Sequence, residues 1–260
     1  MLSEQLLHTL LIVCPLVFLG GLVDAVAGGG GLITLPAYLL AGLPPHAASA
    51  TNKCGNVWGT LLATYRFLKR GEVHLSSAVC GGVGALIGAW AGVKLNMIMP
   101  ERYLYYLMLI IVPVMAVFLL FKREFGTEDH SHELSPRRLL ILSLGIGLVM
   151  GCYDGFFGPG AGTFLMLAFT GLCKFDLLTA SGNTKVANSA SNVASLVTFA
   201  LAGQVVWSVG IPAAICGIAG GYVGSGLALK NGAKVIRPMF FVVLALLSVT
   251  VLYSMYAIQD

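Results

Sequence analysis

Two lysines lie inside long apolar stretches of this sequence. Lys53 is part of the run TNKCGN, and Lys185 is part of the similar run NTKVAN. A lysine at the centre of a membrane helix costs about 2.5–3.5 kcal/mol, so it normally faces a cavity or a partner. At helical spacing, polar side chains share a face with each lysine: Asn56 and Thr60 with Lys53, Asn188 and Asn192 with Lys185.

The two polar faces offer ammonium, amide and hydroxyl donors, which suits the oxygens of an oxyanion. We therefore expect both lysines to bind an anionic substrate, with Asn52, Asn56, Asn188 and Asn192 orienting its oxygens. The alternative is structural: each lysine snorkels toward the membrane surface or pairs with an aspartate.

Two aspartates, Asp24 and Asp154, stand four residues before glycine-rich runs. A carboxyl group there could carry a proton, pair with a lysine, or cap a freed backbone N–H. The sequence leaves proton coupling and a structural role open.

The glycine runs Gly28–Gly31 and Gly158–Gly162 should interrupt a helix. Each precedes a short apolar stretch, residues 32–40 and 163–168, that predicts a half-helix with free N–H groups at its start. Paired glycine breaks before short helices are typical of transporter sites near the membrane midplane. We expect five residues of these breaks to contact the substrate: Gly29, Gly30, Gly31, Gly160 and Ala161. Close helix packing alone is the alternative. The runs lack the GxGxxG pattern of a dinucleotide site.

The elements that carry these residues are apolar and long. Apolar residues make up 57% of the 260-residue chain and charged residues only 10%, which predicts an all-α polytopic membrane protein. Ten apolar segments are expected: 6–27, 31–43, 46–68, 75–97, 102–121, 137–157, 161–173, 177–202, 205–229 and 234–257.

The chain divides into two similar units, residues 1–121 and 137–260, joined by a polar linker at 122–136. Four motifs recur in the same order, at Asp24/Asp154, Lys53/Lys185, Gly71/Gly203, and Gly84-x3-Gly88 with Gly220-x3-Gly224. If both the short segment and the next long one cross the membrane, each unit has five spans. If those two form a re-entrant hairpin, each has three. Both counts are odd, so the units form an inverted repeat.

Lysines and arginines predict the orientation. With the turn at Arg66, Lys69 and Arg70 in the cytoplasm, most other basic residues also fall inside: Lys122, Arg123, Arg137, Arg138, Lys230, Lys234 and Arg237. Lys94 and Arg102 are exceptions. Both termini are then outside.

Several classes of function are disfavoured. The six cysteines show no CxxC spacing, and no catalytic constellation is visible, so we expect no enzyme, metal or cofactor. Basic residues spread between apolar runs argue against nucleic acid as a partner. The stripes of glycines four residues apart, such as Gly84-x3-Gly88-x3-Gly92, predict close helix packing. A homodimer stays open.

Two stretches are similar to motifs of the sulfite exporter TauE/SafE family: the run from Asp24 to Pro36 followed by Ala50-Thr51-Asn52-Lys53, and the run from Gly151 to Gly162. The resemblance covers nearly the whole chain. It implies a transporter of a bacterial or archaeal plasma membrane, with sulfite, sulfoacetate or related sulfur oxyanions as substrates. Ala161 departs from a longer glycine run.

We therefore predict a secondary transporter, an exporter, that binds a small sulfur-containing oxyanion between the two units and works by alternating access, with protons as a candidate coupling ion. A passive anion channel is the main alternative, because the same donors could line a pore. An intramembrane redox protein and a sensor without flux are further rivals.

Overall fold

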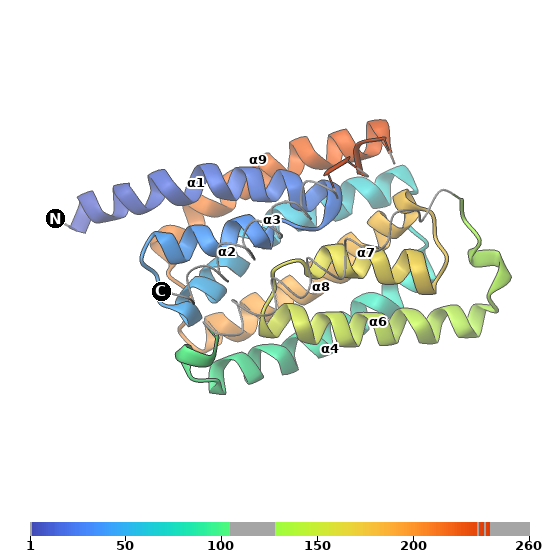
Figure 1. The fold of residues 1–260 in the computed structure, drawn as a ribbon, viewed down its shortest axis with the longest axis horizontal. Coiled ribbons are helices and arrows are strands. Elements are labelled where there is room, and N and C mark those ends of the chain that lie inside the picture. The colour runs from blue at the N-terminus through green and yellow to red at the C-terminus, as the bar shows by residue number, and fades with distance from the viewer. Residues whose placement is uncertain (1, 105–127, 233, 237, 240–260) are drawn as a thin grey trace, which may run out of the picture.

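The computed structural model describes residues 2–104, 128–232, 234–236, 238 and 239. These ranges are helical and contain no strand, as Figure 1 shows. The helices are α1 (Leu2–Ala27), α2 (Gly31–Leu40), α3 (Pro45–Arg70), α4 (Leu75–Ile98), the 3-10 turn η1 (Ser131–Glu133), α6 (Pro136–Phe156), α7 (Ala161–Leu172), α8 (Leu177–Leu201) and α9 (Trp207–Asn231). The predicted segments 102–121 and 234–257 fall almost entirely outside the described residues, as does the linker before residue 128.

Within the described residues, four helices are long and apolar enough to cross a membrane: α1, α4, α6 and α9. The chain is therefore an all-α polytopic membrane protein, as predicted. Helices α3 and α8 have similar lengths, 26 and 25 residues, but carry buried polar side chains along one face. They pack against each other, and α3 also packs against α9 and α8 against α4, which shields these polar faces from lipid.

Local sequence explains where these helices begin and end. Pro45 starts α3, where a missing backbone N–H costs nothing. Asp176 caps α8 by accepting hydrogen bonds from the backbone N–H groups of Leu178, at 2.8 Å, and Thr179, at 3.2 Å. Gly71 ends α3 in a left-handed conformation.

The predicted glycine stripes pack helices together, which confirms that interpretation. A Cβ atom on Gly88 or Gly92 of α4 would overlap the backbone of α6, and one on Gly220 or Gly224 of α9 would overlap that of α1. Gly88 lies against the carbonyl of Leu148. The missing side chains therefore allow the close approach of each helix pair.

The same contacts adjust the correspondence between the two units. Gly220 lies against the carbonyl of Phe18, which holds the place in α1 that Leu148 holds in α6. By contact, Gly88 thus corresponds to Gly220 and Gly92 to Gly224, four residues later than the motif spacing predicts. The separation along the sequence between Gly88 and Gly220 is the same as that between Lys53 and Lys185.

Each short helix folds back on the long helix before it (Figure 1). Helix α2 returns along α1, with Gly20 against Thr34 and Gly30 against Asp24. Helix α7 returns along α6 in the same way, with the Tyr153 ring edge-on to that of Phe164 at 5.8 Å. The hairpins thus join α1 to α2 and α6 to α7, whereas the predicted alternative paired each short segment with the long segment after it.

The turns gather at two ends of the bundle. At one end Gly182, near the start of α8, lies against Glu72 in the α3–α4 turn. The linker docks at this end: the backbone N–H of His130 donates to the Lys174 carbonyl at 2.9 Å. At the other end, the Val206 N–H donates to Thr51 Oγ1, near the start of α3, at 3.1 Å.

Candidate functional site

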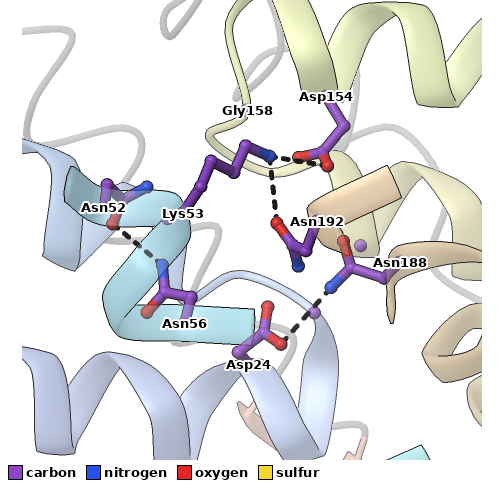
Figure 2. Close-up of a pocket in the computed structure, with 11 residues that line it drawn as sticks. Asp24, Asn52, Lys53, Asn56, Asp154, Gly158, Asn188 and Asn192 are labelled. Atoms are coloured by element: carbon purple, nitrogen blue, oxygen red, sulfur yellow. Dashed lines mark hydrogen bonds and ion pairs between the residues drawn. The ribbon is translucent and has the colours of Figure 1, made fainter. Parts of the chain in front are cut away.

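A pocket opens where the two glycine turns meet the middle of α3 and α8 (Figure 2). The space that no atom fills there amounts to about 310 Å³, including open solvent at the mouth of the pocket. Six helices and the two glycine turns contribute to its wall, with residues from both units of the chain: Asp24, Gly28, Gly31, Asn52, Lys53, Asn56, Asp154, Gly158, Gly162, Asn188 and Asn192.

The strongest interaction in the pocket is an ion pair between the two units. Lys53 Nζ of α3 lies 2.6 Å from Asp154 Oδ2 of α6, and both side chains are almost completely buried. Lys53 Nζ also donates to Asn192 Oδ1 at 3.0 Å, and the Ser191 hydroxyl donates to Asp154 Oδ2 at 2.5 Å. The Asp154 carboxylate therefore has two close donors.

Lys185, the counterpart of Lys53, occupies a different environment. It is fully buried, and its Nζ donates to the backbone carbonyl of Asp24 rather than to the carboxylate. The only hydrogen bond to the Asp24 carboxylate from another described side chain comes from Asn188 Nδ2, at 3.4 Å. Each lysine thus contacts the aspartate of the other unit, but only Lys53 lines the pocket.

An amide network orients the asparagines of α3. Asn56 Nδ2 donates to Asn52 Oδ1 at 2.8 Å and to Thr34 Oγ1 of α2 at 3.1 Å. Because both amide hydrogens of Asn56 are bonded, its orientation and that of Asn52 are fixed. The Nδ2 group of Asn52 is then left without a partner among the described residues.

Asn192 presents a second open donor. Lysine can only donate a hydrogen bond, so the contact with Lys53 assigns Oδ1 of Asn192 as the acceptor. Its Nδ2 has no partner among the described side chains and backbone groups. Figure 2 shows this nitrogen directed toward the space between Asp24 and Asn188.

The glycine turns touch each other beside the pocket. Gly28 has a φ of +77° and Gly158 a φ of +95°, conformations that side chains other than glycine rarely adopt. The N–H of Thr163 donates to the Gly28 carbonyl at 3.1 Å, and its hydroxyl donates to the Ala27 carbonyl at 3.0 Å. The first turn of α7 is therefore bonded to the end of α1.

The structure brings together eight of the residues expected to form the site: Asp24, Gly31, Asn52, Lys53, Asn56, Asp154, Asn188 and Asn192. Five others lie outside the pocket wall: Gly29, Gly30, Gly160, Ala161 and Lys185. Gly28, Gly158 and Gly162 line it but were not predicted as site residues. The sequence places all of them in the two glycine runs but does not single them out, and even the positive φ of Gly28 and Gly158 is shared by Gly160, which lies outside the wall.

A separate group of His130, His132 and Glu133 lies on the exposed linker. Lys174 Nζ bonds the Glu133 carboxylate there, which lowers the pKa of Glu133. This group is at one end of the bundle, away from the pocket. The pair holds the linker against the α7–α8 turn.

Comparison with known proteins now identifies the family. Residues 13–251 match the family described as sulfite exporter TauE/SafE. The chain belongs to this family. It is 36% identical over 254 residues to "Probable membrane transporter protein YfcA" of Escherichia coli K12, an alignment that covers 98% of this chain and 92% of the relative.

Two further relatives carry similar names. "Probable membrane transporter protein ORF9" of Sinorhizobium is 34% identical, over 96% of this chain and 95% of its own. A "Probable membrane transporter protein" of Haemophilus influenzae is 33% identical, over 91% and 92% respectively. No solved structure matches the chain. This TauE/SafE protein is a membrane transporter and not an enzyme.

Proposed function

We propose that this protein is a secondary transporter that exports a small sulfur-containing oxyanion, such as sulfite or an organosulfonate like sulfoacetate. The anion binds in the pocket between the two units. The observation that carries the proposal is a set of donors without a partner among the described residues, on α3 and α8 at the pocket: the third N–H of Lys53 and the Nδ2 groups of Asn52 and Asn192.

Open donors around a buried cation suit an oxyanion. Because these N–H groups belong to residues that line the pocket, an acceptor on the substrate can bond them there. Lys53 supplies positive charge, and the asparagine amides can each donate to a different oxygen. Sulfite and sulfonate groups present three oxygens to such an arrangement, and the family name points to the same chemistry.

The position of the pocket suits alternating access. Its wall combines α1 and α3 of the first unit with α6 and α8 of the second, so relative rocking of the units would expose it first to one side and then to the other. Contacts between helices recur when the units are exchanged: α1–α9 corresponds to α6–α4, and α3–α9 to α8–α4. This recurrence supports two units of the same architecture, and the opposite directions of α3 and α8 along the bundle support an inverted relation between them.

Counterflow in proteoliposomes tests the proposal. Vesicles loaded with unlabelled sulfite or sulfoacetate, at equal pH inside and outside, should take up the labelled anion transiently and saturably. Saturation and trans-stimulation are expected of a carrier, whereas a passive anion channel would show neither. Absence of flux with every oxyanion would overturn the substrate class.

Matched variants locate the site. We expect Lys53→Met to abolish counterflow and Lys94→Met, which removes the same charge from the exposed surface of α4, to retain it. Because Lys53→Met also leaves Asp154 unpaired, the double variant Lys53→Met/Asp154→Asn separates loss of binding from loss of folding. Counterflow at the parental rate in a folded double variant would show that the anion binds elsewhere.

A further inference from the structure

The charges around the pocket balance one another. Two cations, Lys53 and Lys185, and two anions, Asp24 and Asp154, occur among the described residues in or beside it. Lys53 pairs with Asp154, and Lys185 lies on the backbone of Asp24. The four groups together carry no net charge when all are ionised.

An entering anion disturbs this balance. If the substrate binds at Lys53, it adds negative charge beside two carboxylates in a region of low dielectric constant. An uncompensated charge in such a place is strongly unfavourable. Protonation of one carboxylate would offset one unit of the charge brought in.

The two carboxylates differ in how strongly neighbouring groups stabilise their ionised form. Asp154 is 4% exposed and contacts both the Lys53 ammonium, at 2.6 Å, and the Ser191 hydroxyl, at 2.5 Å. Asp24 is only partly buried, and its side-chain partner Asn188 donates from 3.4 Å. Figure 2 shows the Asp24 carboxylate at the pocket wall opposite the Lys53–Asp154 pair. A proton entering with the substrate would therefore go to Asp24.

Groups of both charge signs face Asp24 from the helices packed around α1. Lys185 and Asn188 face Asp24 from α8, Lys53 from α3, Asp154 from α6, and the backbone N–H of Gly30 from the start of α2. Helix α9 contacts α1 through glycines. From α7, the Thr163 hydroxyl donates to the carbonyl of the last residue of α1. The bound anion would add a negative charge near Asp24, which favours its protonated form.

We propose that Asp24 is a proton-binding site and that one proton accompanies each anion through the protein in the same direction. The proton comes from water on the entry side, forms an O–H bond with the Asp24 carboxylate, and returns to water on the exit side. This inference rests on the proposed anion function and adds the coupling ion to it.

Sulfoacetate is the appropriate substrate for the test. Its sulfonate and carboxylate groups stay ionised near neutral pH, so a proton that moves with it travels on the protein. Weakly buffered proteoliposomes with a pH-sensitive dye inside give the ratio of protons to labelled sulfoacetate taken up. We expect about one proton per anion for the parent protein, and accumulation driven by an imposed pH gradient.

Asp24→Asn imitates the protonated side chain and should bring the ratio of protons to anions close to zero. Asp24→Glu should restore it, which a merely structural role would not explain. Because Asp24→Asn could fail to fold, the parent protein gives a second measurement. Purified in detergent and weakly buffered, it should take up about one proton for each sulfoacetate bound.

The outcomes separate the two proposals. Sulfoacetate counterflow without proton movement would overturn the coupling and leave the anion transporter intact. A ratio near one in Asp24→Asn that vanishes in Asp154→Asn would move the proton to Asp154 and overturn the assignment. Absence of binding and flux for all oxyanions would overturn both.

Discussion

At the scale of single residues, the buried pair Lys53–Asp154 should stabilise the folded protein as well as bind the anion. Removing one partner of such a pair leaves the other charge buried and unpaired, which costs about 3–5 kcal/mol. We expect Lys53→Met and Asp154→Asn each to lower the free energy of unfolding by about this amount. The double variant should recover more than half of the loss, because no lone charge remains. Unfolding of the purified protein in denaturing detergent measures these differences.

Lys94→Met is again the matched control. Lys94 is exposed on α4, so its replacement should change stability by no more than about 0.5 kcal/mol. Additive losses in the double variant would contradict the pairing that the structure shows between α3 and α6.

At the scale of elements, the glycine stripes set how closely α4 approaches α6 and α1 approaches α9. A side chain on Gly88 would overlap the carbonyl of Leu148. We expect Gly88→Val to destabilise the protein by about 1–3 kcal/mol, because the helices must separate to make room. Thermal unfolding in detergent, followed by loss of the monodisperse peak in gel filtration, measures the effect.

Gly145, in the neighbouring helix α6, provides the control for this prediction. A Cβ atom there meets nothing within 4 Å, and alanine favours a helix over glycine by about 1 kcal/mol. Gly145→Ala should therefore leave stability unchanged or raise it slightly. Equal losses in both variants would contradict close packing as the reason for glycine at position 88.

At the scale of the whole molecule, the two ends of the bundle should face opposite sides of the membrane. Arg70 and Lys174 lie at the end that carries the docked linker, whereas Pro44 and Ala202 lie at the other. In a background without native cysteines, we expect cysteines at Arg70 and Lys174 to react only with reagents that reach the cytoplasm. Cysteines at Pro44 and Ala202 should react with impermeant thiol reagents from outside.

The same measurement distinguishes the possible hairpins. If residues 31–43 and 46–68 formed a hairpin buried in the membrane, a thiol at Pro44 would lie near the midplane and react slowly from both sides. Labelling of all four positions from one side would contradict the inverted repeat.

Local physical chemistry made much of this protein predictable from its sequence. Apolar stretches of about 20 residues can satisfy their backbone only as helices in lipid, so the all-α polytopic class followed directly. Glycine runs break helices, and the structure ends α1 and α6 there. The lysines and asparagines of α3 and α8 could be grouped because helical periodicity places them on one face. The motifs around Asp24 and Lys53 also sufficed to indicate the family.

Only the tertiary structure decided how equivalent residues differ. The sequence presents Lys53 and Lys185 alike, but one lines the pocket and the other is fully buried on a backbone carbonyl. That difference depends on side chains more than 100 positions away, such as Asp154 for Lys53. The direction in which α2 folds back, and the choice of Gly28 and Gly158 as wall residues, likewise depend on packing between units. Local periodicity carries no information about contacts between segments so distant along the chain.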